Sequence, residues 1–446
     1  MTPEELKNRV DTIVVVMMEN RSFDHVLGYL RHPQFGNRTD VDGIEDLANP
    51  SYVNNNLDGQ GKRPFWMPDA AFISDLPHGA DAVTRQMKLA RLVKRFTMTG
   101  FVEAYEDAFH SQVAEPPVMG LLRPADLPTT SVLADRYTVC DRWFSCVPTS
   151  TAPNRLMSMC GVTPLRDTHT VLPDQSTVYD WLLEHGVRWR VYSAGFPFLT
   201  LMPRILPLML TGHFRRIEDL PHDLATERPD DWPQVIFIEP EYYDSPLHFR
   251  APCDNHPPLG MALGESFVAQ VYQTLAASPR WQRSVFVLTY DEHGGFFDHV
   301  PPLPVAYRHP NGVAFETTGP RIPAIVAGPY APRGVSHAHL DNTSILQLLA
   351  ERFGAAGESF SPEVLDRQNQ GIASLAAILD AAANNSQIST FATPANLNAV
   401  PAPPRPASFR SSLETAFESA IRDLVSRHRT EALIKYPELR ALVRAA

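Results

Sequence analysis

Acidic and amide side chains follow two apolar segments of the chain at the points where those segments end. They are Glu19 and Asn20 after residues 13–18, and Asp291 and Glu292 after residues 284–290. In an open parallel sheet, ligands bind beyond the carboxyl ends of the strands. Carboxylate and amide oxygens that meet there can surround a divalent cation, which offsets their mutual repulsion. One such pair is more simply explained as a helix cap or a solvated loop, but two pairs favour a metal site.

A threonine at the start of a predicted helix is a candidate nucleophile. Pro153 suits the first turn of a helix and Gly161 suits its end, so Thr151 falls at the amino end. Backbone N–H groups and the helix dipole attract an anion there. A metal ion can lower the pKa of a nearby hydroxyl, and Arg155 offers donors for phosphate oxygens. The simpler alternative is that Ser150 or Thr151 only caps the helix.

Four histidines lie in segments that could place an imidazole beside these groups: His78, His256, His299 and His337. Those at 256 and 299 precede proline-rich stretches, and a stiff loop can hold an imidazole in one orientation. One histidine could protonate a leaving group and another could donate to phosphoryl oxygens. Because the chain has 16 histidines, each of them alone is also compatible with a structural role.

Short β-branched segments alternate with helical patterns along the chain. Strands are predicted at residues 12–18, 189–192, 234–238, 284–290 and 322–327. Helices are predicted at residues 80–96, 176–183, 264–277 and 343–353. This alternation predicts an α/β fold with a mostly parallel central sheet flanked by helices. The 41 prolines in 446 residues predict long ordered loops between these elements.

Composition limits the classes of partner and compartment. The net charge of −11 lacks the basic field of a nucleic-acid binder, so no nucleic-acid partner is expected. No apolar segment is long enough to span a membrane and no signal-peptide pattern is seen, so we expect a cytoplasmic protein or one exported without a leader. The apolar segment 194–210 is either buried core or a lipid-facing loop. Four cysteines do not form a disulfide framework, and reduced packing cysteines are favoured over a local disulfide.

Several motifs together resemble a bacterial phosphoesterase family that includes non-haemolytic phospholipases C and an acid phosphatase related to them. They follow the family's order across about residues 10 to 355. The motifs are VVVMMENRSFDH at 14–25, CDRWFSC at 140–146, TAPNR at 151–155, YDEHGGFFDHVPP at 290–302, RIPAIVAGP at 321–329 and VSHAHLD at 335–341.

This resemblance implies an alkaline phosphatase/sulfatase-like fold with one divalent metal ion. The implied ligands are Glu19, Asn20, Thr151, Asp291 and Glu292. Thr151 is also the implied nucleophile, which would form a phosphothreonine intermediate. The implied active-site histidines are His256 and His337, with His299 and His78 nearby. The residues before Pro153 depart from the family pattern, so Thr149 and Ser150 stay open as alternative nucleophiles.

The resemblance implies a metal-dependent hydrolase of phosphate esters. A phospholipase C that cleaves the phosphodiester of a phospholipid headgroup is preferred, and an acid phosphatase acting on phosphomonoesters is the alternative. A sulfatase is less favoured because threonine cannot be converted to the required aldehyde. A non-catalytic lipid- or phosphate-binding protein is also less favoured. Hard oxygen ligands suit Ca²⁺, Mg²⁺ or Mn²⁺, and Zn²⁺ stays open.

The expected substrate is a phospholipid or a small phosphate ester, and a transient contact with a membrane surface is compatible with it. The oligomeric state is not indicated. We predict a phosphoesterase domain at 1–393, a Pro-rich linker at 394–410 and a C-terminal helical tail at 411–446.

Overall fold

The structure of the chain is a computed structural model, which describes residues 1–69, 75–386, 391 and 411–441. The Pro-rich linker predicted at 394–410 lies outside the described residues. The division of the chain into three parts therefore stays a prediction.

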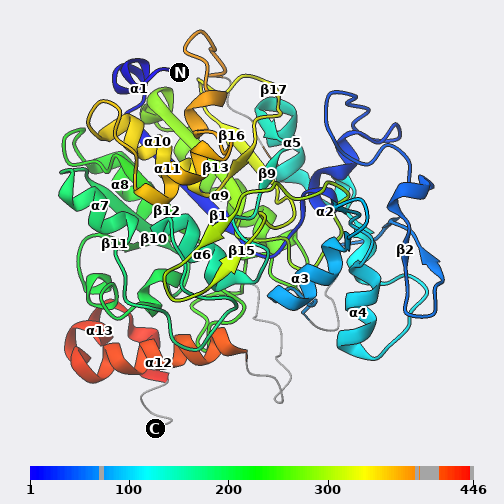
Figure 1. Cartoon of the computed structure of the whole chain (residues 1–446). Helices are drawn as coiled ribbons and strands as arrows, with labels where there is room; N and C mark the ends of the chain where they lie inside the picture. Colours follow the sequence, from blue (N-terminus) through cyan, green and yellow to red (C-terminus); the bar gives the residue numbers. More distant parts are fainter. Residues whose placement is uncertain (70–74, 387–390, 392–410, 442–446) are drawn as a thin grey trace.

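Eight strands form the central sheet, in the order β11-β10-β12-β1-β13-β16-β8-β17 (Figure 1). Their bounds are β1 Thr12–Met18, β8 Thr138–Cys140, β10 Trp189–Ser193, β11 Phe214–Arg216, β12 Val235–Glu239, β13 Ser284–Tyr290, β16 Ala324–Ala327 and β17 Gly334–Ser336. β1 pairs in parallel with both β12 and β13, and β16 is antiparallel to both of its neighbours. The sheet is thus mostly parallel, as predicted.

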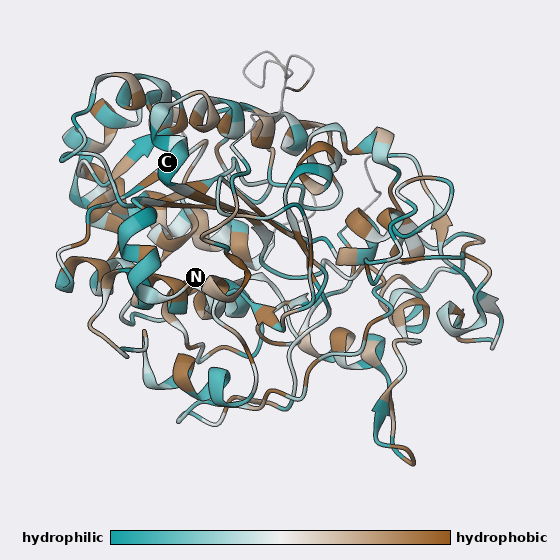
Figure 2. Cartoon of the chain, turned by 90° about the horizontal axis from the view of Figure 1, so that it is seen from above, coloured by the Kyte–Doolittle hydropathy of each residue, from teal (hydrophilic) through white to brown (hydrophobic). Residues whose placement is uncertain are grey.

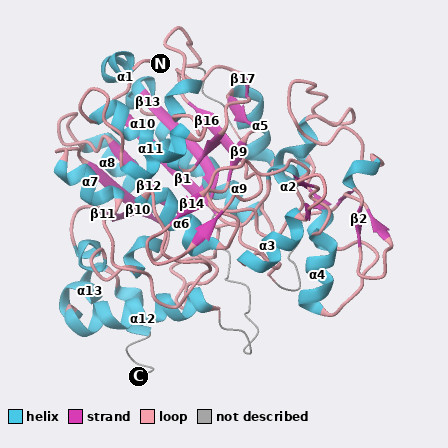
Figure 3. Cartoon of the chain, viewed as in Figure 1, coloured by secondary structure: helices cyan, strands magenta, loops and turns pink. Residues whose placement is uncertain are grey.

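Helices flank the sheet in two groups whose members contact one another (Figure 3). One group comprises α1 Pro3–Arg9, α6 Thr151–Cys160, α10 Thr343–Phe353 and α11 Pro362–Asn369. The other comprises α5 Pro128–Arg136, α8 Leu220–Thr226 and α9 Ala262–Ala276. The remaining helices are α2 Phe23–Leu27, α3 Ala80–Met87, α4 Phe101–Phe109, α7 Val178–Glu184, α12 Ser412–Arg427 and α13 Arg429–Lys435. This arrangement confirms the predicted fold class.

The strand predictions differ in quality between the centre and the edges of the sheet. The central strands β1 and β13 have the predicted bounds, and every residue in both is buried. β8, β11 and β17 were not predicted, because each has three residues and lacks a long apolar run. Figure 2 shows the apolar strands crossing the middle of the molecule.

Short two-residue strands form small pairs outside the central sheet. They are β2 Asn54–Asn55, β3 Gly61–Lys62, β4 Phe65–Trp66, β5 Leu89–Ala90, β6 Arg95–Phe96, β7 Gly120–Leu121, β9 Trp143–Phe144, β14 Tyr307–Arg308, β15 Ala314–Phe315 and β18 Leu340–Asp341. Several of them belong to a lobe that contains α3, α4 and β2 and lies beside the sheet (Figure 1). This lobe has its own small core, which includes Val83, Met98 and Phe101.

The helix predicted at 80–96 is wrong in its second half. α3 ends at Met87, because the next residue, Lys88, adopts a positive φ of 46° that a right-handed helix cannot continue. The chain then forms an antiparallel hairpin in which Leu89 pairs with Phe96 and Ala90 with Arg95. The apolar residues that suggested a longer helix therefore belong to a hairpin.

The two C-terminal helices cover the apolar segment 194–210. Phe417 of α12 contacts the rings of Phe196, Phe198 and Tyr242, with centroids 6.1, 6.5 and 5.7 Å apart. Lys435 of α13 donates to the carbonyls of residues 209, 211 and 214. Residues 196 to 202 are largely buried, so the buried-core alternative for this segment is correct.

The four cysteines are buried and unpaired. Burial raises the pKa of the Cys140 and Cys146 thiols. They are therefore inert packing residues, as favoured from the sequence. Within the described part of the chain, no helix combines the length and apolarity that crossing a membrane requires.

Candidate active site

The carboxyl ends of β1 and β13 bring the first group of predicted site residues together. The two strands are neighbours, and Met18 is in register with Tyr290. The backbone N–H of Asn20 donates to Asp291 Oδ1 over 3.1 Å. The loops are so close that a Cβ on Gly294 would lie 2.0 Å from the Asn20 carbonyl oxygen. Glycine is required at this position because its φ is also positive.

The hydroxyl of Thr151 points at this group from the start of α6. Its Oγ1 lies 3.4 Å from Asn20 Oδ1, and the side chain is buried. The other two hydroxyls of the segment have different partners. Thr149 donates to the Arg166 carbonyl and to the Asp167 carboxylate, both within 2.8 Å.

Ser150 is hydrogen-bonded to Thr168, a residue that was not predicted to belong to the site. Its Oγ accepts hydrogen bonds from the backbone N–H and the hydroxyl of Thr168, over 2.9 and 3.0 Å. Thr168 in turn accepts from the N–H of Ala152. This backbone N–H at the start of α6 is therefore already hydrogen-bonded, whereas the sequence predicted that the N–H groups there would be free to bind an anion. Of the three candidate hydroxyls, only that of Thr151 faces Asn20 among the described residues.

Arg155 is bound by carboxylates. Its Nη2 donates to Glu19 Oε1 over 3.0 Å, and its Nε lies 3.6 Å from Asp291 Oδ2. The rings of Phe198 and Tyr242 lie beside the guanidinium, with centroids 5.5 and 5.4 Å from Cζ. In this structure Arg155 faces carboxylates, and its predicted donation to phosphate oxygens stays a prediction. Its partners hold it as a counter-charge that positions Glu19 and Asp291.

Three buried carboxylates share this site. Burial and the nearby Asp291 raise the pKa of Glu19 well above its usual value. Burial raises the pKa of Asp291 as well, against the opposing effect of Arg155. Burial acts in the same direction on Glu292, but His78 and His293 lower the pKa of that carboxyl overall. Burial and the nearby cationic side chains thus act in opposite directions on these three carboxyl groups.

The oxygen atoms of the site fit a divalent cation. Asp291 Oδ2 and Glu292 Oε1 are buried without a hydrogen-bond partner among the described residues. Unpartnered buried carboxylate oxygens are costly unless a ligand binds them. Asn20 Oδ1 and Thr151 Oγ1, 3.4 Å apart, add oxygens of the kind that hard cations prefer. The residues present are therefore compatible with a divalent metal ion, and which of them bind it stays a prediction.

Two of the predicted histidines lie beside this set. The Nε2 atoms of His78 and His256 are 3.4 and 3.1 Å from the same atom, Asn20 Nδ2. The Nδ1 atoms contact the carbonyls of Leu76 and Pro257, so each imidazole is oriented by its own loop. Burial alone would lower the pKa of His256, but surrounding carboxylates, first Asp75, raise it to about 10. In this structure His256 Nε2 accepts from the Asn20 amide N–H.

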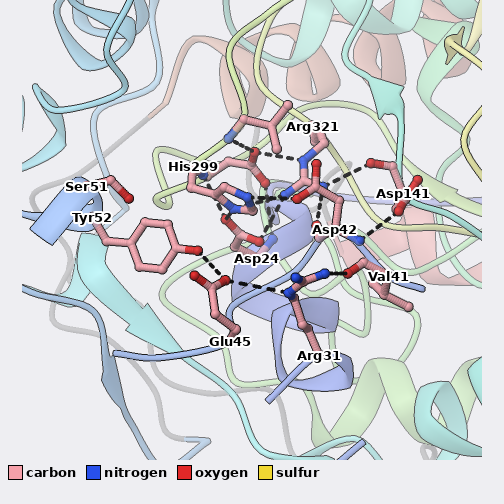
Figure 4. A network of polar contacts seen from close by, with 12 residues as sticks. Asp24, Arg31, Val41, Asp42, Glu45, Ser51, Tyr52, Asp141, His299 and Arg321 are labelled. Atoms are coloured by element: carbon pink, nitrogen blue, oxygen red, sulfur yellow. Dashed lines mark hydrogen bonds and ion pairs between the residues drawn. The ribbon is translucent and has the colours of Figure 1, made fainter. Parts of the chain in front are cut away.

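His299 belongs to a separate polar network (Figure 4). Its Nδ1 lies 2.6 Å from Asp24 Oδ2 and its Nε2 lies 3.1 Å from Asp42 Oδ1. Arg321 donates to Asp24 Oδ1 and to Asp298 Oδ1, over 2.9 Å in both cases. Asp24, Asp298 and His299 lie close enough to hold a metal ion, but the buried guanidinium of Arg321 already supplies their counter-charge.

His337 also lies apart from Thr151. Its side chain is 60% exposed, and Nδ1 contacts both carboxylate oxygens of Asp141 at 2.9 and 3.0 Å. Asp141 Oδ2 accepts from the backbone N–H of Asp42, which links this histidine to the network of Figure 4. No contact among the described residues joins His299 or His337 to the Thr151 site.

Sequence reasoning also missed two carboxylates near the site. Glu239 ends β12 and accepts from the backbone N–H of Phe198 and the hydroxyl of Tyr242. The strand-end rule that identified Glu19 would have found it. Asp75 lies 3.6 Å from His78 Nδ1, and its Oδ1 has no hydrogen-bond partner among the described residues. No sequence signal beyond its distance of three residues from His78 pointed to it.

Comparisons with known proteins place the chain in a family. A model described as Phosphoesterase family matches residues 10–356. Non-specific phospholipase C1 of Arabidopsis thaliana is 32% identical over 352 residues, which cover 74% of this chain and 63% of that protein. The hemolytic phospholipase C of Pseudomonas aeruginosa is 26% identical over 419 residues, covering 79% of this chain and 54% of that protein. The matches thus span between half and two thirds of these relatives.

Among solved structures, a protein in the alkaline phosphatase superfamily from Vibrio parahaemolyticus aligns with 11% identity and a TM-score of 0.34. The alignment covers 70% of this chain and 83% of that chain. The family model itself spans well over half of the sequence and includes all the residues of the site around Thr151. This chain therefore belongs to the phosphoesterase family.

Proposed function

We propose that this protein is a metal-dependent phospholipase C, which hydrolyses the bond between the glycerol oxygen and the phosphate of a phospholipid headgroup. The observation that carries the proposal is the position of the Thr151 hydroxyl, 3.4 Å from Asn20 Oδ1, in a site where Asp291 Oδ2 and Glu292 Oε1 are buried without a hydrogen-bond partner among the described residues. The relatives named phospholipase C support the choice of a phospholipid. The alternative of a phosphomonoesterase uses the same residues and is an outcome of the test below.

Residues Glu19, Asn20, Thr151, Asp291 and Glu292 would hold the divalent cation. When bound, the cation supplies positive charge that favours the ionised threonine and neutralises phosphate oxygens. The protein contributes rigid placement of these ligands, because Asp291 Oδ1 accepts from two backbone N–H groups, those of Asn20 and Glu292. Such preorganisation lowers the cost of assembling the site during reaction.

In the first step Thr151 releases its hydroxyl proton to solvent and its Oγ attacks phosphorus, so that a new Oγ–P bond forms while the bond from phosphorus to the glycerol oxygen breaks. We assign to His256 the proton that the departing diacylglycerol oxygen requires: its Nε2 lies 3.1 Å from Asn20 Nδ2, and in the protonated imidazole this nitrogen donates to the departing oxygen in place of accepting from the amide. His78 Nε2, 3.4 Å from the same amide, would donate to a phosphoryl oxygen in the same way. Attack and departure lie roughly in line in such transfers.

In the second step water attacks the phosphothreonine. The P–Oγ bond breaks, Thr151 takes back a proton from solvent, and the phosphorylated headgroup leaves. His256, which has lost its proton in the first step, accepts a proton from this water, so that the histidine returns to its starting state. The two steps together add one water to one ester bond.

The test is hydrolysis of phosphatidylcholine and of p-nitrophenyl phosphate by the wild-type protein and by three threonine and serine variants. Thr151→Val should lower kcat at least about 1,000-fold, the scale on which loss of a nucleophile acts. Thr149→Val and Ser150→Ala, the matched controls, should retain turnover because their hydroxyls are bound elsewhere.

Release of diacylglycerol and phosphocholine from phosphatidylcholine supports phospholipase C action. Hydrolysis of p-nitrophenyl phosphate alone would favour the phosphomonoesterase instead. Full activity of Thr151→Val, or its loss only in Ser150→Ala, would remove Thr151 from the mechanism.

A further inference from the structure

The hairpin that follows α3 exposes apolar side chains beside basic ones. Leu92 is fully exposed, and Val93 and Leu89 are 70% and 47% exposed. These are three of eight large exposed hydrophobic residues in the described part of the chain. Single exposed apolar residues are ordinary on protein surfaces, but three within five residues of one hairpin indicate an interaction site.

The hairpin is strongly basic within an acidic protein. The last turn of α3 and the hairpin together, residues 84–97, include five cations and no acid, although the whole chain has a net charge of −11. Two cations at the base are paired, Arg85 with Asp107 over 2.7 Å and Lys88 with Glu103 over 2.5 Å. The three around the tip are Arg91, Lys94 and Arg95, and within the described ranges none of them forms an ion pair.

The base of the hairpin is rigidly held, so its tip is presented outward. The N–H of Thr97 donates to the Lys88 carbonyl and that of Met98 to the Met87 carbonyl, both over 3.0 Å. Met87 and Met98 are buried in the small core of the lobe. A hydrogen bond from Val93 N–H to the Ala90 carbonyl closes the turn.

The same element is connected to the candidate active site. His78 lies two residues before α3, and the hairpin begins where α3 ends. Eight helical residues span about 12 Å. Gln86, in the last turn of α3, donates to the Pro77 carbonyl and contacts His293 Nε2 over 2.8 Å. His293 directly follows Glu292, so the hairpin base is bonded to the loop that holds the site.

We propose that the hairpin of residues 88–96 docks the protein on an anionic phospholipid membrane, with Leu92 and Val93 entering the headgroup region. Exposed aliphatic side chains gain from an apolar phase, and uncompensated cations gain from a negative surface potential. An anionic bilayer offers both the apolar phase and the negative surface potential. Residues 89–95 include no aromatic side chain on which nucleic-acid bases would stack, and Phe96 packs against the core of the lobe, which disfavours that class of partner.

This inference rests on the proposed function, because docking by the hairpin would bring the candidate active site to the membrane surface that carries the phospholipid substrate. The binding itself needs no turnover. We therefore test it by sedimentation of the full chain with vesicles of phosphatidylcholine, with and without phosphatidylserine. The variants are Leu92→Asn/Val93→Asn and Arg91→Glu/Lys94→Glu.

The wild-type protein should bind vesicles that contain phosphatidylserine more tightly than vesicles of phosphatidylcholine alone. The apolar double variant should bind both kinds at least about tenfold more weakly. The charge double variant should lose about 30-fold on the phosphatidylserine vesicles alone. Ile434→Asn in α13, where the side chain is 75% exposed, and Arg9→Glu in α1 are the matched controls and should bind like the wild type.

Hydrolysis of a monomeric short-chain phosphatidylcholine separates the two proposals. The hairpin variants should hydrolyse it at the wild-type rate but lose activity on vesicles. Vesicle binding without any hydrolysis by the wild type would refute the phospholipase proposal and leave the docking proposal supported. Equal vesicle binding by the wild type and both hairpin variants would overturn docking, as would binding to a single-stranded oligonucleotide in place of vesicles.

Discussion

Replacement of Arg321 by methionine should destabilise the protein strongly. The guanidinium is fully buried and donates to the carboxylates of Asp24 and Asp298 and to the carbonyls of Asp42 and Asp141, over 2.7 to 2.9 Å (Figure 4). Loss of one partner from a buried ion pair costs about 3–5 kcal/mol, because the other charge stays buried without its counter-charge. We expect the free energy of unfolding to fall by about 4 kcal/mol.

Urea unfolding followed by circular dichroism measures this change. Arg321→Lys keeps the charge but loses the two-sided donor geometry, so it should fall between wild type and Arg321→Met. Adding Asp298→Asn to Arg321→Met removes one of the uncompensated carboxylates and should recover part of the loss. A decrease below about 1 kcal/mol in Arg321→Met, the size typical of surface substitutions, would refute the counter-charge role of Arg321.

Three further predictions concern pH, metal and the C-terminal helices. Burial alone would lower the pKa of His299, but Asp24 and Asp42 raise it to about 9, so the stability that its charge contributes is complete below about pH 6.5 and is lost as pH rises through about 9. His299→Gln should flatten the fall in melting temperature between pH 7 and about 10, and an unchanged slope would contradict this assignment. Chelation should abolish hydrolysis of phosphatidylcholine, Asp291→Asn should lower the bound metal measured by elemental analysis, and equal metal content in that variant would remove this carboxylate from the ligand set. Phe417→Ala should cost about 3–5 kcal/mol in urea unfolding, since this buried ring packs against three aromatic side chains, and a cost near zero would show that α12 is not integral to the core.

Much of the fold could be predicted because its central strands are continuous apolar runs. β1 and β13 are buried along their whole length, and such runs are readable without any tertiary information. The meeting of Glu19 with Asp291 follows from the same property, because the polar residues that end parallel neighbours share one edge of the sheet. Short edge strands such as β17 could not be predicted, since three half-buried residues have no distinctive pattern.

Side-chain partners within the site were harder to predict. The sequence favoured Thr151 as the nucleophile and left Thr149 and Ser150 open as alternatives, and the difference between them comes from residues 166 to 168, which bind the hydroxyls of Thr149 and Ser150. The sequence also could not show which histidines lie at the site, because this depends on tertiary contacts. His337, for example, stands in a family motif but is 60% exposed beside Asp141.

The sequence by itself determined where the chemically important features lie along the chain. It shows which segments are apolar strands, where carboxylates follow those strands, and that a helix begins at Thr151. These features are local, since they depend on residue type and on spacing of a few positions. Only the tertiary structure decided which hydroxyl faces Asn20, that Arg155 is bound to Glu19, and that residues 88–96 leave the helix as a hairpin. These contacts depend on hydrogen bonds and burial by segments that are distant in the sequence, so no local sequence pattern predicts them.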